Sequence, residues 1–439
     1  MKIFLIAEKI SPSLSTSVKS GFYKFLSNSQ KADFNITETV STIINQVRKN
    51  GDKSLVSYSN QFDKTSYQKA EDFVTSAKEI AEAEKSLSSE IKTALKTAYK
   101  RIENYHQKQL PKDFHFTDKA GVKLGNIWRT IDSIGVYVPG GSASYPSSVL
   151  MSAVPAIVAG VKEISICVPS SAGKLNSAVL FAAKICGIKK IYKIGGAQAI
   201  AALALGTKTI AKVDKIVGPG NSYIATAKKI LFGEVGIDMI AGPTDVTIIA
   251  DKNNNPAWIA ADALSQLEHG QDSKAFIITD CEDFALKISA AIDSLIGDLP
   301  RKNIIEKSLE NSAIFVIKNL VEAPHLVNFI APEHLEIATK NPQKFLPKIK
   351  NAGAIFLGNY TPEAIGDYMA GPSHTLPTSA SAKFSSGLSV FDFLKRISLI
   401  SCDKKSFEKL AQATAILAES EGLHAHKLSV EIRKSPPCS

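Results

Sequence analysis

Gln266 and His269 lie three residues apart at the end of the stretch PAWIAADALSQLEHG, which runs from Pro256 to Gly270. We expect one helix here, because Pro256 suits a first helical position, the apolar residues recur with helical spacing, and Gly270 can take the left-handed conformation that ends a helix. Both polar side chains would share one face in the last turn, where the partial negative charge of the helix end favours a metal cation. The same residues also fit an ordinary helix cap.

Two further stretches combine acids with a histidine or a hydroxyl group. AGPTDV is expected to deliver Thr244 and Asp245 through a Gly-Pro turn to the start of a strand, and IAPEHLEIA places Glu333 and His334 after Pro332, at an expected helix start. Glutamate and histidine side by side can shuttle protons near neutral pH. Alternatively, Glu333 only complements the helix dipole and His334 lies on the surface.

Two more stretches add ligand-type side chains. The Gly- and Pro-rich loop YTPEAIGDYMAGPSHTLPT contains Asp367 and His374, and EGLHAHK near the end of the chain contains Glu421, His424 and His426. A carboxylate, two imidazoles and an amide from separate segments would form a four-ligand N/O site that suits zinc.

Short β-rich runs alternate with helical segments from about residue 131 onward. The first series is 133–141, 163–171, 190–196 and 214–221, and the second is 245–251, 275–280, 312–318 and 353–358. This alternation predicts parallel strands with right-handed crossovers, and two such series predict an α/β fold of two Rossmann-like, incompletely doubly wound domains that face a cleft. Helices are expected over about 36–110 and 404–422 as well.

The strands of the first series end in glycine pairs or in a glycine-rich turn. These ends are Gly140-Gly141, Gly195-Gly196 and Gly218-Pro219-Gly220-Asn221, and parallel sheets bind ligands beyond such strand ends. Glycine lets a dinucleotide approach the backbone, and the following helix N-terminus can hold its phosphates. The G-x-G-x-x-G fingerprint is missing, so the glycines could equally make tight turns.

Composition narrows the class of protein. The chain has 439 residues, 44% hydrophobic and 21% charged, which fits about three ordered domains, and it has no apolar run long enough for a membrane span. The net charge of +10 comes from scattered lysines without interleaved aromatic residues, which argues against nucleic-acid binding. Five scattered cysteines and the lack of a signal peptide indicate a cytoplasmic protein with reduced thiols.

Eight motifs, taken together and in order, resemble those of the histidinol dehydrogenase family over essentially the whole chain. They are YVPGG, GGAQAIAALA, DKIVGPGN, AGPTDV, LSQLEHG, PEHLEI, GDYMAGPSHTLPT and EGLHAHK. The resemblance implies a homodimeric enzyme with one zinc ion per subunit. Such an enzyme oxidises L-histidinol through an aldehyde to L-histidine and reduces two NAD molecules, as the last step of histidine biosynthesis.

The resemblance also implies roles for individual residues. The implied zinc ligands are Gln266, His269, Asp367 and His426. The implied substrate contacts are Thr244, Gln266, His269, Glu333, His334, Asp367, Glu421 and His426. The implied NAD contacts are Tyr137, Gln198 and Asn221. Glu333 and His334 are the implied acid/base pair, while His424 is a neighbour and His374 supports its loop.

The expected division of the chain follows from the strand series and the resemblance. Residues 1–30 would pack with the tail, residues 31–115 would join a metal- and substrate-binding α/β domain over 240–380, and residues 116–239 would form the NAD-binding domain. A helical tail over 381–439 would complete the active site of the partner subunit, so that Glu421 and His426 act there.

Two departures and three alternatives remain. Many family members have Ser-Glu at Thr244-Asp245 and an acidic or amide residue at Ser373, which bears on substrate positioning but not on the metal ligands. The alternatives are a related dehydrogenase of another small polar alcohol, a zinc hydrolase that uses Glu333 as its base, and an inactive binding protein.

Overall fold

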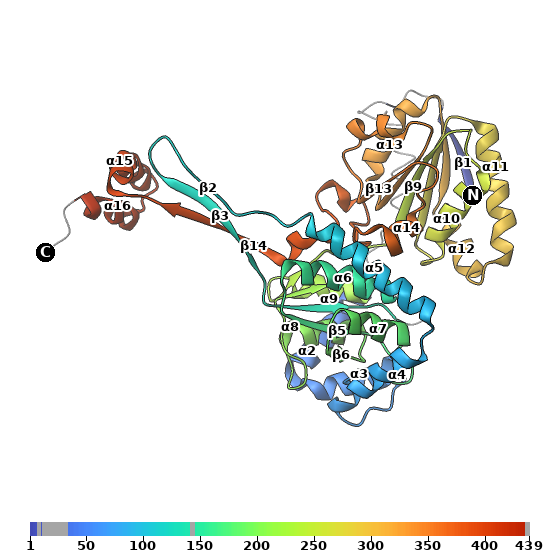
Figure 1. The fold of residues 1–439 in the computed structure, drawn as a ribbon, viewed down its shortest axis with the longest axis horizontal. Helices are drawn as coiled ribbons and strands as arrows, with labels where there is room; N and C mark the ends of the chain where they lie inside the picture. Colours follow the sequence, from blue (N-terminus) through green and yellow to red (C-terminus); the bar gives the residue numbers. More distant parts are fainter. Residues whose placement is uncertain (7–9, 11–33, 141–144, 435–439) are drawn as a thin grey trace.

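The computed structural model describes residues 1–6, 10, 34–140 and 145–434. Figure 1 shows two α/β domains and a long ribbon that carries a small helical tail away from both. The expected α/β fold with two parallel sheets is confirmed. No helix in these ranges is long and apolar enough to cross a membrane. Gly141, residues 11–30 and residues 435–439, for which expectations were stated, lie outside the described residues.

The first domain has a five-stranded parallel sheet in the order β6-β5-β4-β7-β8. Its strands are β4 (Ser133–Tyr137), β5 (Glu163–Cys167), β6 (Lys190–Tyr192), β7 (Lys215–Val217) and β8 (Gly236–Ile237). The chain leaves β4 toward β5 on one side and later returns to β7 on the other. This reversal opens a crevice beyond the carboxyl ends of β4 and β7, where doubly wound sheets bind ligands.

Helices cover both faces of this sheet. They are α6 (Pro146–Ala159), α7 (Ser177–Ile185), α8 (Gly196–Leu205) and α9 (Ser222–Leu231). The apolar residues of α8 lie on all of its sides, and eight of its residues, Ala197 to Ala204, are buried. A helix that is apolar on all sides must be covered by other helices on the face that points away from the sheet.

The N-terminal helices form this outer layer, so the expectation that residues 31–115 join the 240–380 domain is wrong. These helices are α2 (Phe34–Asn50), α3 (Asp52–Phe62), α4 (Ala77–Ser86) and α5 (Ser89–Gln107). α2 packs on α8 and α9, α4 packs on α7, and α5 packs on α6. Among the described residues, α5 contacts the second domain near its end, where Arg101 donates to the carbonyl of Met369.

His106 in the last turn of α5 predicts a pH-dependent stability. Its side chain is buried, its Nδ1 lies 2.7 Å from Gln109 Oε1, and burial lowers its pKa from the usual value. The unfolded chain therefore takes up a proton first as the pH falls, and the stability that neutral His106 contributes is complete above about pH 6.5 and is lost below it.

We expect the free energy of unfolding of the wild type to fall more than that of His106→Leu between about pH 7.5 and about pH 5.5. Urea unfolding followed by circular dichroism measures both. Equal falls in the two proteins would contradict the assigned burial of a neutral imidazole.

The second domain has a six-stranded parallel sheet in the order β1-β11-β10-β9-β12-β13. Its strands are β1 (Lys2–Ile6), β9 (Asp245–Ala250), β10 (Lys274–Thr279), β11 (Ala313–Ile317), β12 (His334–Ala338) and β13 (Ala354–Leu357). The helices around it are α10 (Pro256–Leu267), α11 (Glu282–Leu295), α12 (Lys302–Leu309), α13 (Ala323–Ile330) and the short α14 (Glu363–Ile365). Strand order again reverses, between β9 and β12.

Two expectations about this sheet are wrong. Residues 2–6 do not pack with the tail, because their apolar run pairs in parallel with β11 at the sheet edge. Glu333 and His334 do not open a helix, because HLEIA is buried along its whole length as β12, between β9 and β13. α13 ends at Ile330, Ala331 caps it with a positive φ of 52°, and the chain then enters the strand through Pro332.

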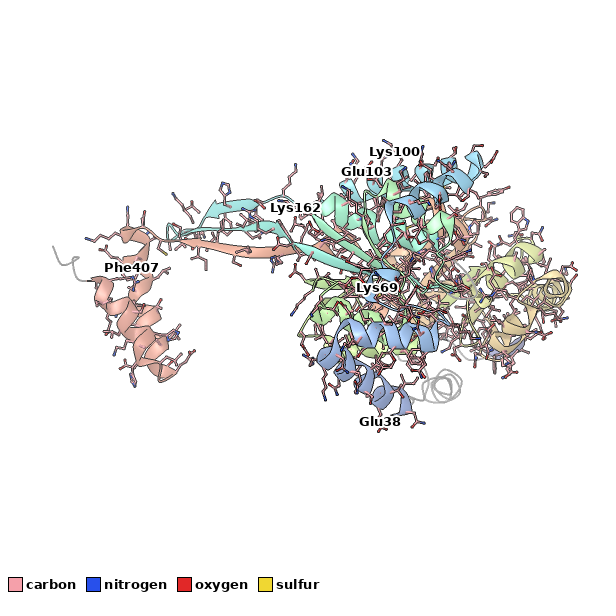
Figure 2. All side chains as sticks on the ribbon, turned by 90° about the horizontal axis from the view of Figure 1, so that it is seen from below. Glu38, Lys69, Lys100, Glu103, Lys162 and Phe407 are labelled. Atoms are coloured by element: carbon pink, nitrogen blue, oxygen red, sulfur yellow. The ribbon has the colours of Figure 1, made fainter. Side chains whose placement is uncertain are left out.

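A three-stranded antiparallel ribbon, which was not predicted, connects the tail to the first domain. Its strands are β2 (Phe114–Thr117), β3 (Lys123–Thr130) and β14 (Leu394–Ser401), in the order β14-β3-β2. The expected tail helix is confirmed as α15 (Lys404–Ser420), followed by α16 (His424–Glu431). Figure 2 shows the ribbon and the helix that carries Phe407 standing clear of both domains.

Candidate active site

A cavity of about 570 Å³ lies where the two domains face each other. The first domain contributes the carboxyl ends of β4 and β7, and the second contributes the amino ends of β9 and β12 with the loops that follow α10 and α14. The first sheet therefore follows the rule that ligands bind beyond the carboxyl ends of parallel strands. The second sheet instead places its site residues at the amino ends of its strands. The predicted site residues that line the cavity are Tyr137, Asn221, Thr244, His269, Glu333, His334 and Asp367.

Two adjacent parallel strands bring the acid/base residues together. β9 and β12 pair with Val246 opposite His334, so Asp245 and Glu333 lie side by side just before this pair. The backbone N–H of each donates to the carboxyl group of the other, both at 3.3 Å. The strand register thus fixes Glu333 and His334 at the cavity wall.

His334 presents an unprotonated ring nitrogen to the cavity. Its Nδ1 lies 3.3 Å from the carbonyl oxygen of Asp245, which can only accept, so Nδ1 carries the proton. Nε2 is buried, has no hydrogen-bond partner among the described residues and lies 3.9 Å from Asp367 Oδ1. Burial lowers the pKa of His334 to about 3, so the ring is neutral at neutral pH. Nε2 is therefore placed to accept a proton from a bound molecule.

Glu333 belongs to a buried network with Thr244 and Gln266. The Thr244 hydroxyl group contacts both the Glu333 carboxyl group and the Gln266 amide. Because the Asp245 N–H can only donate, the Gln266 amide oxygen faces it at 3.1 Å, and the amide nitrogen lies 2.9 Å from Glu363 Oε2. Burial raises the pKa of Glu333 well above its usual value, which makes its carboxylate a stronger base than an exposed one.

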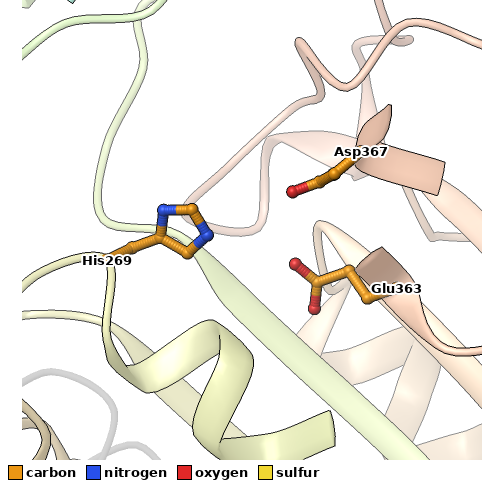
Figure 3. A group of neighbouring side chains, drawn as sticks. All are labelled: His269, Glu363 and Asp367. Atoms are coloured by element: carbon orange, nitrogen blue, oxygen red, sulfur yellow. The ribbon is translucent and has the colours of Figure 1, made fainter. Parts of the chain in front are cut away.

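Three ligand-type side chains converge beside this network. Ligand atoms of His269, Glu363 and Asp367 all lie within 4.8 Å of one another, and Figure 3 shows the three side chains pointing toward a common centre. Burial raises the pKa of Asp367 to about 6 and that of Glu363 well above its usual value. A divalent cation would stabilise these crowded carboxylates in their charged form, so the donor set of one imidazole and two carboxylates fits zinc.

Glu363 is the residue that the sequence analysis missed. It lies in the predicted loop, four residues before Asp367, where α14 passes into a π-helical turn over Gly366–Ala370. π turns are frequent at functional sites, and a spacing of four residues on a helix puts two carboxyl groups on one face. The four-residue spacing between Glu363 and Asp367 is the sequence pattern that could have predicted Glu363 as a site residue.

The end of α10 differs from its expectation in detail. Gln266 lies in the last turn, but the helix ends at Leu267, and His269 follows as part of the next turn. Gly270 is not among the glycines with positive φ, so it does not end the helix in the expected way. Gln266 therefore points into the buried network, while His269 reaches the cavity.

The side of the cavity that the first domain forms contains two of the three predicted NAD contacts, Tyr137 and Asn221. Gln198 lies behind them in the first turn of α8, fully buried, and neither of its amide atoms has a hydrogen-bond partner among the described residues. The Gly196 N–H donates to the Tyr137 hydroxyl at 3.4 Å. An unpaired buried amide beside glycine turns fits a site that holds a polar cofactor.

Ser373 and His374 tie the two domains together. Ser373 Oγ donates to the carbonyl of Met151 at 3.1 Å, and His374 Nε2 lies 3.2 Å from Ser148 Oγ, so both bonds reach α6. His374 also lines the cavity, and burial lowers its pKa to about 4. The loop is thus held against the first domain at the level of the site.

Glu421 and His426 are not brought to this cavity within one chain. Both are exposed on the tail, at the end of α15 and on α16, far from the domains in Figure 1. The cavity that one chain forms is lined by seven of the predicted site residues, without these two.

Comparison with known proteins places the chain in a family. The sequence profile of histidinol dehydrogenase matches residues 26–434. Histidinol dehydrogenase 1 of Nostoc sp. is 49% identical over 413 residues, which cover 94% of this chain and 95% of the relative. The enzyme of Brucella abortus is also 49% identical, over 94% of this chain and 96% of the relative.

A solved structure extends the likeness to the fold. The crystal structure of histidinol dehydrogenase from Elizabethkingia anophelis matches with a TM-score of 0.90 and 36% identity, and it covers 99% of this chain and 98% of that one. With likeness of this extent in sequence and in fold, the chain belongs to the histidinol dehydrogenase family of oxidoreductases.

Proposed function

We propose that the protein oxidises L-histidinol through L-histidinaldehyde to L-histidine, reduces two NAD molecules in turn, and thereby completes histidine biosynthesis. The observation that carries the proposal is the unprotonated Nε2 of His334, which lies 3.9 Å from Asp367 Oδ1 in the cluster of His269, Glu363 and Asp367, while Nδ1 of the same ring lies 3.9 Å from Glu333 Oε2. Family membership supplies the substrate.

Zinc, one ion per subunit, would be held by Gln266, His269, Asp367 and the partner subunit's His426. When bound, it would supply an electrophilic centre that holds and orients the substrate for oxidation. Glu363 accepts a hydrogen bond from the amide nitrogen of Gln266 and so fixes which way that amide faces.

His334 acts in the first oxidation. Its Nε2 takes the proton of the substrate hydroxyl group while the carbinol carbon gives up a hydride to the nicotinamide, which leaves the aldehyde. The bond from Nδ1 to the Asp245 carbonyl keeps the ring in the tautomer that can accept this proton.

Glu333 acts between the two oxidations. Its carboxylate takes a proton from water as the water oxygen bonds to the aldehyde carbon, and the aldehyde oxygen takes back the proton that His334 received, which gives the hydrate. The hydrate would then give up its one carbon-bound hydrogen as hydride to a second NAD and its two hydroxyl protons, one to His334 and one to solvent, and become the carboxylate of histidine. Thr244, Gln266, His269 and Asp367, with Glu421 and His426, would contact the substrate through these steps.

NAD would contact Tyr137, Gln198 and Asn221. NAD supplies the hydride acceptor in both oxidations. Asn221 Oδ1 already caps α9 by accepting from the backbone of Tyr223 and Ile224, so its amide nitrogen is the group that remains for the cofactor.

We further propose a cytoplasmic homodimer with shared sites. The four described cysteines form no disulfide, which suits a reducing compartment. The tail exposes large apolar side chains, among them Leu417 at 64%, Leu428 at 60% and Ile432 at 64%, which a second subunit would cover. The tail of one subunit would then bring Glu421 and His426 to the other subunit's cavity.

A mixed dimer tests the sharing. His334→Asn and His426→Ala are each expected to abolish activity alone. In a heterodimer of the two, one cavity combines an intact His334 with an intact His426, so refolding an equal mixture should restore about a quarter of wild-type activity. If the two residues act within one chain, every site keeps one lesion and no activity returns.

A substrate series tests the proposed reaction itself. We expect NADH formation with L-histidinol and a much lower kcat/KM with other small amino alcohols that lack the imidazole ring. Faster NADH formation with one of those alcohols would assign the protein to a related dehydrogenase activity. Turnover of an ester or amide without NAD would assign it to hydrolysis.

A further inference from the structure

A buried ion pair stands behind the glycine turn that ends β7. Lys228 of α9 and Asp238, which follows β8, meet with Nζ 2.6 Å from Oδ1, and their side chains are only 2% and 1% exposed. Both residues line the cavity on the side of the first domain. Neither residue was a predicted site residue.

The pair holds one residue of the turn, Gly218, by both of its backbone polar groups. Lys228 Nζ donates to the carbonyl oxygen of Gly218 at 2.6 Å, and the Gly218 N–H donates to Asp238 Oδ2 at 2.8 Å. Gly218 cannot be held by a side chain of its own, because it has a φ of 109° and a Cβ there would lie 2.1 Å from the carbonyl oxygen of Tyr137. The turn is therefore pressed against the end of β4 and fixed through Lys228 and Asp238.

Stability alone does not explain this pair. Removing two charges from water costs much of what their attraction returns, and apolar residues of similar size are often as stabilising as a buried pair. What apolar side chains cannot do is bind the N–H and the carbonyl of Gly218 at once. The pair fixes the orientation of the Gly218 backbone at the crevice between β4 and β7, where the strand order reverses.

We infer that Lys228 and Asp238 are positioning residues for the dinucleotide, acting through the Gly218-Pro219-Gly220-Asn221 turn. The inference rests on the proposed NAD site and deepens it. The Lys228 ammonium group is neutralised by Asp238, so its role is to link α9 to the turn through the Gly218 carbonyl and not to bind a phosphate directly. The substrate side has its own anchors, because Gly242 donates to Thr378 Oγ1 at 2.6 Å and Thr244 contacts Gln266.

The test compares variants by NAD binding without turnover. Lys228→Met removes the donor to the Gly218 carbonyl, and the double variant Lys228→Met with Asp238→Asn removes both charges, so it leaves no unpaired buried charge if the single variant fails to fold. Lys215→Met is the matched control. Its ammonium group binds the Asp392 carbonyl at 2.7 Å, at the opposite end of β7.

We expect the Kd for NAD, measured by isothermal titration calorimetry on the zinc-loaded full-length protein, to rise about ten-fold in the double variant. The Kd for L-histidinol and the zinc content should stay at wild-type values, and Lys215→Met should bind NAD as the wild type does. In steady state, the KM for NAD should rise while that for L-histidinol does not.

Three results would overturn the inference. If the wild type binds NAD and the double variant binds it equally well, the pair does not position the turn, and the proposed function stands. If Lys215→Met weakens NAD binding as much, the effect belongs to the domain as a whole. If the wild type binds no NAD, the proposed function fails and this inference fails with it.

Discussion

Glu333→Gln is expected to convert most of the enzyme's output from histidine to aldehyde. Glutamine keeps the size of the side chain and a contact to Thr244 but cannot take a proton from water, so the hydrate forms slowly. General-base catalysis contributes a factor of about 10² to 10⁴, and histidine formation should fall by that order. A single-turnover experiment should still show the first NADH, because His334 and the zinc ligands are unchanged.

The measurement that checks this prediction is product analysis with a carbonyl-trapping reagent. The trapped aldehyde should rise and the second NADH should lag. Zinc content serves as the internal control and should match the wild type. Histidine formation at the wild-type rate would show that Glu333 is not the base.

His269→Ala is expected to remove both metal and activity. The variant removes one of the four proposed zinc ligands, Gln266, His269, Asp367 and the partner's His426, and leaves an incomplete donor set. Changes around a metal site typically cost 10- to 100-fold in affinity even when they spare the ligands, so loss of a ligand should cost at least about a hundred-fold. Zinc content after dialysis measures this loss.

His325→Ala is the matched control for this prediction. His325 lies on α13 and does not line the cavity, so its replacement should leave zinc content and NADH formation unchanged. If His269→Ala retains one zinc per subunit at the same affinity, His269 is not a ligand and the cluster in Figure 3 does not form the metal centre.

The sequence predicted the strands of the two sheets well where they end in a turn. Runs such as EISIC and DVTIIA are short, apolar and bounded by glycine or polar residues. This pattern is typical of buried parallel strands. β12 was missed because proline followed by glutamate also reads as a helix start, and only pairing with β9 and β13 decides between the two. The ribbon was missed because its pairing of residues 123–130 with 394–401 is too remote for a local pattern.

The site could be predicted in part for a physical reason. Motif order predicted Thr244, Glu333, His334, His269 and Asp367 as site residues, and all five line one cavity. Local sequence does not show which amide or carboxylate completes the donor set, because that depends on how Gln266 and Glu363 turn toward each other. Nor does it show the role of Lys228 and Asp238, whose common partner Gly218 has no side chain.

The packing of the N-terminal helices could not be predicted either. Their amphipathic faces require a partner but do not specify one, and either domain offered apolar helices. The decisive feature is α8, whose all-round apolar surface needs cover on the side away from the sheet. α2 supplies that cover, and it places no catalytic side chain in the cavity.

The most direct test of the proposed reaction is the ratio of NADH formed to L-histidinol consumed by the zinc-loaded protein, with and without a chelator. We expect two NADH per L-histidinol, with histidine as the product, loss of activity with the chelator, and recovery when zinc is restored. One NADH per L-histidinol, or full activity after the metal has been removed, would contradict the proposed double oxidation at a zinc centre.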